Sequence, residues 1–399
     1  MSSDRIVQWH SGRHVHPMYR EQLHAVPEGW RYTWTRPEFE DATAATKKVT
    51  LSSAGSARTM EAAEATALRI LSTAGYLHTT RVRPAPGIAL IHSAERLIRR
   101  SPVPYVLDLE HVDLFVIYQR AAYRAPWTVP LLERMLLDER LRFLLPWSNA
   151  ARQSVLHRVS PSVAARLEHK LRTVYPAVRP RVKHARDHTT GPIRILFVGT
   201  KFYEKGAVEA IRAVLAARAA GANIELDIVT YAPPEWEQRI ASEPGIRLHR
   251  PGGQDVVRAL YEQADALLFP SHMDTYGVVV GEAMSYGVPV LAPNHLALAE
   301  LVTDGVNGAL FPAENMLFGT DTSCIYRHTL PPPRAYLEAL RTPGASYVDG
   351  IAEALTSLAD DPGRLSDLSD GALVTVTDGL LSVRRRATAL QELYDAAAD

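Results

Sequence analysis

The chain has 399 residues, of which 46% are apolar and 22% are charged, with 44 basic and 44 acidic side chains. This length exceeds the size at which a single hydrophobic core usually stops growing, so we expect two domains. The composition excludes a disordered chain, no basic run with interleaved aromatic residues favours nucleic acid as a partner, and no apolar segment reaches the roughly 18 residues of a membrane span.

The charges are unevenly distributed along the chain. Met1–Val178 holds 24 basic and 16 acidic residues, a balance of +8, and the remainder has a balance of −8. This asymmetry predicts either an anionic acceptor or peripheral contact with an anionic lipid surface in the first half, or simply scattered solvated charges. The N-terminus lacks the pattern of a signal peptide, and the single cysteine, Cys324, fits a reducing compartment. We therefore expect a cytoplasmic protein.

The first domain, predicted over residues 1–178, begins with a strand at Arg5–His10. Gly12 follows that strand, where a glycine either lets the backbone approach a phosphate or makes a plain turn. The later segments are predicted as a helix at Arg58–Gly75, a strand at Gly87–His92, a helix at Ala94–Arg100, a strand at Tyr105–Leu109, a helix at Leu131–Leu145, a strand at Phe143–Ser148, and helices at Ala150–Val159 and Pro161–Val174.

The strand at Tyr105–Leu109 places Glu110 and His111 directly after its carboxyl end. Ligands of open α/β sheets bind at this edge, so His111 is a candidate functional residue. A histidine that merely caps the strand is the alternative.

Composition changes over Tyr175–Pro192, which contains several prolines and almost no apolar periodicity, and we place the linker at residues 179–192. The second domain, 193–380, alternates regularly, which predicts a parallel sheet covered by helices on both faces. Its segments are strand Ile193–Val198, helix Ala207–Ala220, strand Ile224–Thr230, helix Glu235–Ala241, strand Ile246–His249, helix Gln254–Gln263, strand Ala266–Pro270, a helix beginning near Val278, and strands Val288–Pro293 and Gly308–Phe311.

The segment Glu314–Tyr347 breaks this alternation, and its three consecutive prolines predict an irregular insertion or surface loop. Helix Val348–Ala359, a turn at Asp360–Gly363 and a closing helix near Leu381–Ala398 complete the chain.

Two loops of the second domain carry the chemistry. The loop Gly199–Gly206 (GTKFYEKG) holds Lys201 and Lys205 directly before a helix. The other loop holds Asp274, and seven residues separate it from Glu282. A helix N-terminus near Val278 favours phosphate, lysines neutralise a diphosphate, and carboxylates accept hydrogen bonds from sugar hydroxyls. A nucleotide sugar, which has a diphosphate and several hydroxyl groups, would use all three features.

These stretches resemble glycosyltransferase family 4, the retaining nucleotide-sugar enzymes of GT-B fold. The detailed resemblance covers FVGTKFYEKG, ADALLFPSHMDTYGVVVGEAMSYGVPVLA and ELVTDGVNGALF, whereas YVLDLEHV in the first half is a fainter match. The resemblance implies two Rossmann-like parallel-sheet domains facing across a cleft. It also implies that the last helix, about 381–399, returns to the first domain.

The resemblance further implies roles for individual residues. Lys205 contacts the donor diphosphate, Glu282 binds the ribose hydroxyls, and Asp274 and His111 lie near the transferred sugar. Thr200 stands where the family often has arginine, so Lys201 is a candidate for that phosphate contact. The remaining predicted donor-binding residues are Gly12, Gly199, Tyr276, Gly277 and Val278.

The predicted function is therefore transfer of a sugar, with retention, from a nucleoside-diphosphate sugar to a hydroxyl on a small molecule, glycan or lipid-linked acceptor. The family uses no metal, and neither a metal site nor a cofactor is expected. A nucleotide-sugar epimerase of the same architecture and a non-catalytic nucleotide-sugar-binding protein stay open as alternatives.

Overall fold

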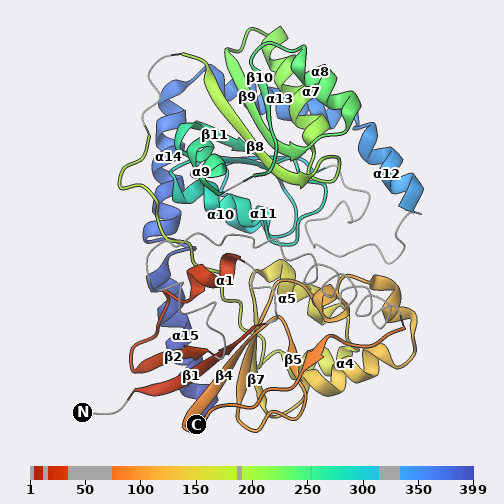
Figure 1. The fold of residues 1–399 in the computed structure, drawn as a ribbon, viewed down its shortest axis with the longest axis vertical. Coiled ribbons are helices and arrows are strands. Elements are labelled where there is room, and N and C mark those ends of the chain that lie inside the picture. Colours follow the sequence, from red (N-terminus) through yellow and green to blue (C-terminus); the bar gives the residue numbers. More distant parts are fainter. Residues whose placement is uncertain (1–3, 12–16, 35–73, 187–190, 253, 314–332) are drawn as a thin grey trace. The chain divides into compact units, whose positions relative to one another are not determined.

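The computed structural model describes residues 4–11, 17–34, 74–186, 191–252, 254–313 and 333–399. These residues form two compact units, one made of Met1–Ala177 with Val383–Asp399 and the other of Val178–Ser382 (Figure 1). Gly12, most of the predicted helix Arg58–Gly75, and Cys324 lie outside the described residues.

The first unit is built on a five-stranded parallel sheet of order β2-β1-β4-β6-β7. Its strands are β1 (Arg5–His10), β2 (Trp30–Trp34), β4 (Ile88–Ala94), β6 (Tyr105–Leu109) and β7 (Leu141–Pro146). The other elements are α1 (Pro17–Gln22), the short strands β3 (Thr79–Thr80) and β5 (Leu97–Ile98), the 3₁₀ helices η2 (Val112–Val116) and η3 (Arg120–Arg124), α4 (Thr128–Leu136), α5 (Asn149–Leu156), α6 (Pro161–Leu167) and α15 (Val383–Ala398).

The last helix, α15, covers one face of this sheet. Leu390 and Tyr394 pack on a core that includes Val7, Leu90 and Val106. A buried charge network fixes the helix as well, because Arg386 donates two hydrogen bonds to Asp108 (2.9 and 3.2 Å). The final helix is thus an integral part of the first unit, although it lies at the far end of the sequence.

Three predictions in this unit are wrong at the level of secondary structure. Ala94–Arg100 is no helix, because Glu95 (φ +70°) and Arg100 (φ +55°) have left-handed backbones and β5 between them pairs with β3. The helix predicted at Leu131–Leu145 ends at Leu136, since the following residues enter β7. The helix predicted at Pro161–Val174 ends at Leu167, because the backbone around Leu171 bridges to Leu144.

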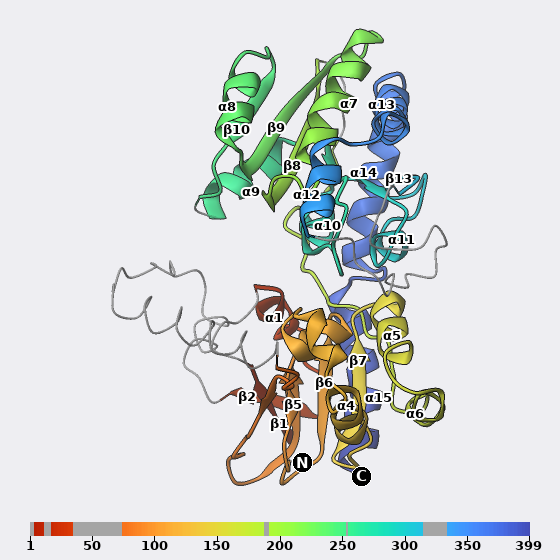
Figure 2. The same cartoon turned by 90° about the vertical axis from the view of Figure 1, so that its right-hand side faces the viewer.

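The second unit has a six-stranded parallel sheet of order β10-β9-β8-β11-β12-β13, with helices on both faces (Figure 2). Its strands are β8 (Ile193–Lys201), β9 (Ile224–Tyr231), β10 (Ile246–His249), β11 (Ala266–Leu268), β12 (Val290–Pro293) and β13 (Gly308–Phe311). Its helices are α7 (Ala207–Ala219), α8 (Pro234–Ala241), α9 (Gln254–Gln263), α10 (Val278–Ser285), α11 (Leu298–Leu301), α12 (Pro333–Arg341), α13 (Ala345–Ala359) and α14 (Pro362–Thr377).

Buried apolar side chains of β8, β9, α7 and α13 form the largest part of one core in this unit. The segment predicted as a linker runs along the unit, since Arg181 N–H donates to Ser285 O (2.7 Å) and Arg186 N–H donates to Ser369 Oγ (3.0 Å). No helix in the described part of the chain is long and apolar enough to cross a membrane.

Three predictions in the second unit need correction. Strand β8 continues through Gly199 to Lys201, after a register shift that begins at Val198. Residues 314–332 of the predicted insertion lie outside the described residues. The described remainder contains α12 and the first turn of α13, because a proline such as Pro333 is compatible with the first turn of a helix. The predicted turn at Asp360–Gly363 is the start of α14, where Asp361 caps the helix by accepting from Arg364 N–H.

Candidate functional site

Two neighbouring strands of the second sheet bring the two motif-bearing loops together. β8 and β11 pair in parallel, so the loops that follow them leave the same edge. His272 N–H donates to Glu204 O (3.0 Å), which ties the loop after β11 to the loop after β8. The backbones also approach closely, because a Cβ added to Gly206 (φ +81°) would lie 2.1 Å from Pro270 O. Only glycine fits this position without moving one of the loops.

Lys205 spans the two loops. Its Nζ donates to Asp274 Oδ2 (2.7 Å) and to Met273 O (2.8 Å), and its ammonium lies 5.8 Å from the centre of the Phe269 ring. The side chain is only 19% exposed, so it is held in place rather than mobile in solvent. Gly199 makes room for it, since a Cβ at that position would lie 2.7 Å from Lys205 Cβ.

Asp274 organises the start of helix α10. Its Oδ1 accepts from Gly277 N–H (2.6 Å) and Tyr276 N–H (3.2 Å), while Oδ2 accepts from Lys205. Gly277 takes a left-handed backbone (φ +86°) as the residue that precedes the helix. Helix α10 begins at Val278. The first N–H groups of a helix have no earlier helical carbonyl as acceptor. The loop therefore presents a lysine and a helix N-terminus at one sheet edge.

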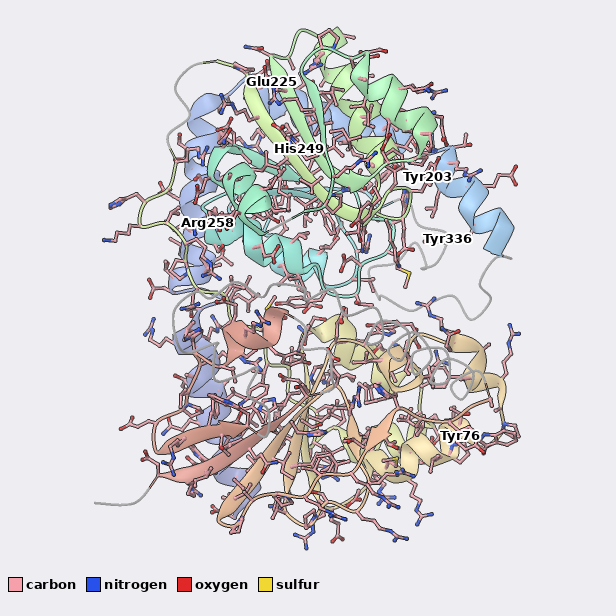
Figure 3. The ribbon with its side chains drawn as sticks, in the orientation of Figure 1. Tyr76, Tyr203, Glu225, His249, Arg258 and Tyr336 are labelled. Atoms are coloured by element: carbon pink, nitrogen blue, oxygen red, sulfur yellow. The ribbon has the colours of Figure 1, made fainter. Side chains whose placement is uncertain are left out.

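Lys201 differs from Lys205 in both exposure and partner. Its side chain is 66% exposed and donates to Glu204 Oε1 (2.8 Å). Tyr203, from the same loop, lies at the outer side of the unit (Figure 3), and its hydroxyl donates to Glu235 Oε1 (3.1 Å). The structure thus brings Lys205 and Asp274 together, whereas Lys201 forms a separate surface pair.

Glu282 lies within helix α10. Tyr261, a buried residue of α9, donates its hydroxyl to Glu282 Oε2 (3.3 Å) and stacks on Tyr286 with ring centres 5.4 Å apart. Burial raises the pKa of Tyr261, and the neighbouring Glu282 carboxylate raises it further. Tyr261 therefore stays a neutral donor that orients the carboxylate of Glu282.

His111 belongs to the first unit, at the carboxyl end of β6. It is 2% exposed and precedes η2, where its Nδ1 accepts from Asp113 N–H (3.1 Å). The proton of the neutral ring consequently lies on Nε2, which is a hydrogen-bond donor. Burial lowers the pKa of His111 to about 4, opposed by Asp113 and reinforced by Arg120 and Arg158. The ring is neutral at physiological pH.

The same edge of the first unit carries two glutamates. Burial and the neighbouring Glu110 carboxylate together raise the pKa of Glu95 to about 7, although Arg96 acts in the opposite direction. Glu110 accepts from the Tyr118 hydroxyl (3.3 Å). Both Glu95 and Tyr118 have left-handed backbones (φ +70° and +58°), which are strained for residues with a side chain.

Sequence reasoning missed three side chains that hold the loop after β11. Glu209, fully buried on α7, contacts His272 Nε2, and His295 Nε2 contacts Ser271 O (2.8 Å). A glutamate in the first turn of a helix looks like an ordinary helix-stabilising residue, and neither His272 nor His295 was given a role by the motifs. Only their meeting in the folded unit distinguishes them. Within the described ranges, no group of three or more His, Cys, Asp or Glu side chains is placed to hold a metal ion.

Part of the chain that holds these loops is similar to known proteins. Residues 192–318 match the family described as glycosyl transferases group 1. Over 218 residues the chain is 29% identical to glycogen synthase of Mycobacterium tuberculosis, covering 53% of this chain and 45% of that protein. Over 138 residues it is 30% identical to the amylovoran biosynthesis glycosyltransferase AmsK of Erwinia amylovora, covering 32% of this chain and 34% of that protein. The matched segments thus span less than half the length of these relatives.

Solved structures extend the likeness to nearly the whole chain. Anabaena HepE in complex with UDP has a TM-score of 0.59 at 12% identity, covering 98% of this chain and 99% of that one. A glycosyltransferase from Rickettsia africae has a TM-score of 0.58 at 12% identity, covering 99% and 98%. The predicted fold class of two Rossmann-like domains is confirmed. The chain therefore has the GT-B fold, and its residues 192–318 match the glycosyl transferases group 1 family.

Proposed function

We propose that the chain is a retaining glycosyltransferase of the family 4 kind, which transfers a sugar from a nucleoside-diphosphate sugar to a hydroxyl acceptor without a resident metal. One observation carries the proposal: a half-buried lysine and a helix N-terminus, joined by one aspartate, meet at the carboxyl edge of a parallel sheet inside the matched region. Structural neighbours solved with UDP support the choice of ligand class.

Lys205 is prepared for an anion. An ammonium group has three N–H donors, and the contacts to Met273 and Asp274 use two of them. The third is available to a phosphate oxygen without a change in the position of the side chain. Such a charge-assisted contact contributes roughly 1.5–3 kcal/mol, and it strengthens as the departing diphosphate gains charge.

The N-terminus of helix α10 supplies uncharged N–H donors beside the Lys205 ammonium group. The amides at Val278 begin a helix of eight residues whose N-terminal end carries a partial positive charge. In the proposed complex these amides and Gly277 lie along the diphosphate. Because both oxygens of Asp274 are engaged by Lys205 and by the loop amides, we infer that Asp274 assists the donor chiefly by holding these groups.

Glu282 and His111 complete the proposed assignment. The Glu282 carboxylate, oriented by Tyr261, accepts hydrogen bonds from the ribose hydroxyls. His111, neutral and donating from Nε2, lies beside the transferred sugar. No residue is asked to form a covalent intermediate: the acceptor attacks from the leaving-group face, the diphosphate assists in taking its proton, and the chain positions the reactants.

A thermal-shift panel of UDP, GDP, ADP, TDP and their sugars tests the donor assignment. A ligand present at 100 times its Kd stabilises the folded state by about 2.7 kcal/mol, which is expected to raise the Tm of one unit by about 5–10 °C. If no nucleotide in the panel raises the Tm at millimolar concentration, the proposal is wrong.

Product analysis then separates the possible activities. A transferase releases the nucleoside diphosphate and forms a glycoside only when a hydroxyl acceptor is supplied. An epimerase converts the donor without any acceptor, and a binding protein releases no diphosphate under any condition. Retention is read from the anomeric configuration of the product by NMR.

A further inference from the structure

Glu209 is a buried carboxylate that the proposed chemistry does not use. It is the third residue of α7, and its side chain is 0% exposed. A glutamate at this position commonly bonds to the amide of the residue before the helix, but here Gly206 N–H donates to Tyr203 O (3.1 Å). The carboxylate turns instead to His272, with Oε1 2.5 Å from Nε2. Its other oxygen, Oε2, has no hydrogen-bond partner among the described residues.

Burying a carboxylate is unfavourable because the charge loses its hydration. The contact with His272 is what offsets this cost for Glu209. The histidine that Glu209 holds lies two residues before Asp274. His272 also donates its amide to Glu204 O (3.0 Å), and its ring lies 5.6 Å from the ring of Tyr347 on α13. The loop is thus restrained from α7 and from the loop after β8.

The restraint continues along the whole loop. His295 contacts Ser271 O, Glu209 contacts His272, and Lys205 contacts Met273 O and Asp274. Every residue from Ser271 to Asp274 is therefore held by a side chain from outside the loop. Of these contacts, only the one from Glu209 comes from a fully buried acid.

We propose that Glu209 is a positioning residue for the donor-binding loop and acts through His272. By fixing the loop backbone, it places Asp274, and hence the lysine and the α10 amides, in register for a nucleoside diphosphate. This inference rests on the proposed function. It names a residue outside the motifs and assigns it no contact with the donor. A displacement of about 1 Å at such a site is enough to reduce catalysis up to 100-fold.

The test compares two substitutions at one position. Glu209→Leu removes the acceptor for His272, whereas Glu209→Gln keeps an oxygen that accepts from Nε2–H. Asp361→Ala is the matched control, because it removes the cap of α14 in the same unit, near Ala216 and Ala220 at the opposite end of α7. Binding is measured with whichever of UDP, GDP, ADP and TDP gives the largest shift in the panel. Hydrogen exchange is measured on peptides covering residues 270–280.

Glu209→Leu is expected to raise the Kd at least tenfold and to speed exchange of residues 270–280, while Glu209→Gln stays within about threefold of the unmodified protein. Asp361→Ala is expected to lower the Tm without changing the Kd. Unchanged exchange and unchanged Kd in Glu209→Leu would overturn the inference, as would an equal loss of affinity in Asp361→Ala.

Two further outcomes are also decisive. If Glu209→Leu does not fold, the comparison moves to His272→Leu and His272→Gln, with the same expectation that only the leucine variant loses affinity. If the unmodified protein binds none of the four diphosphates, the proposed function fails. The exchange comparison still tests whether Glu209 fixes the loop.

Discussion

The two units present the same kind of edge, the carboxyl ends of a parallel sheet, with opposite chemistry. The second unit places Lys205 and a helix N-terminus at its edge. The first unit places Glu95, Glu110 and a neutral His111 there. The edge of the second unit therefore attracts an anion, and the edge of the first unit offers carboxylate acceptors and a neutral histidine donor. The same kind of sheet edge thus carries different chemistry in the two units.

The edges also differ in how they are supported. In the second unit, the loop after β11 is held by Lys205, Glu209 and His295, which all belong to the α/β alternation of that unit. In the first unit, the residues before His111 depend on a helix from the end of the chain, because Arg386 pairs with Asp108. His92 Nε2 lies 3.1 Å from the same carboxylate, and Trp9 stacks on the His92 ring with centres 3.9 Å apart. Disturbing the support should therefore affect the edges separately.

The largest effect is expected from removing Arg386. Arg386→Met leaves Asp108 buried without its main counter-charge, and breaking a buried pair in this way costs about 3–5 kcal/mol. Urea unfolding, monitored by hydrogen exchange, should show this loss of unfolding free energy in peptides of the first unit. Unchanged protection in the first unit would contradict the prediction, whereas peptides of the second unit serve as the internal control.

Acid should destabilise both edges through their buried histidines. Burial lowers the pKa of His111 and of His295 to about 4 in the folded chain, whereas the unfolded chain binds a proton near pH 6.5. Protonation of the unfolded chain therefore lowers the unfolding free energy little above pH 6.5, and it lowers it more as the pH falls toward 4. Each histidine should then cost about 2–3 kcal/mol at pH 4.5 relative to pH 7.

Single substitutions divide this pH effect between the units. His111→Gln should flatten the pH dependence of unfolding in the first unit, and His295→Gln should flatten it in the second. The measurement is unfolding free energy at several pH values, with hydrogen exchange reporting on each unit. A slope that neither substitution changes would show that other groups control the acid response.

The next effect concerns catalysis at the second edge. Lys205→Ala removes a preorganised cation and should reduce turnover by on the order of 100-fold. Lys201→Ala is the matched control, because that side chain is 66% exposed and paired with Glu204, and we expect a change of less than about threefold. The steady-state rate of diphosphate release decides between them. Equal losses in the two variants would argue against the special role of Lys205.

The smallest effect is expected from crowding Lys205. Gly199→Ala adds a methyl group 2.7 Å from Lys205 Cβ, so the lysine must shift and donor affinity should fall about tenfold. Gly350→Ala, on α13, meets no atom within 4 Å and should leave affinity unchanged. Donor titration of both variants checks this, and a Gly199→Ala protein that binds normally would mean that the lysine tolerates displacement.

The sequence by itself predicts much of the second unit and less of the first. Buried parallel strands such as β11 and β12 are continuous apolar runs separated by a helix, so the sequence alone predicts their order. In the first unit, Ala94–Arg100 has the composition of a helix, yet the pairing of β5 with β3 and two left-handed residues impose another path. Pairing between distant segments overrides local preference there.

The motifs at the second edge were likewise visible as residue types and spacings, but their contacts were not. Lys205 meets Asp274 across 69 positions of sequence, Glu209 meets His272 across 63, and Asp108 meets Arg386 across 278. Spacing can predict that two loops share a sheet edge, because parallel strands end together. Which donor reaches which acceptor depends on close packing of the folded units, and that is settled only by tertiary structure.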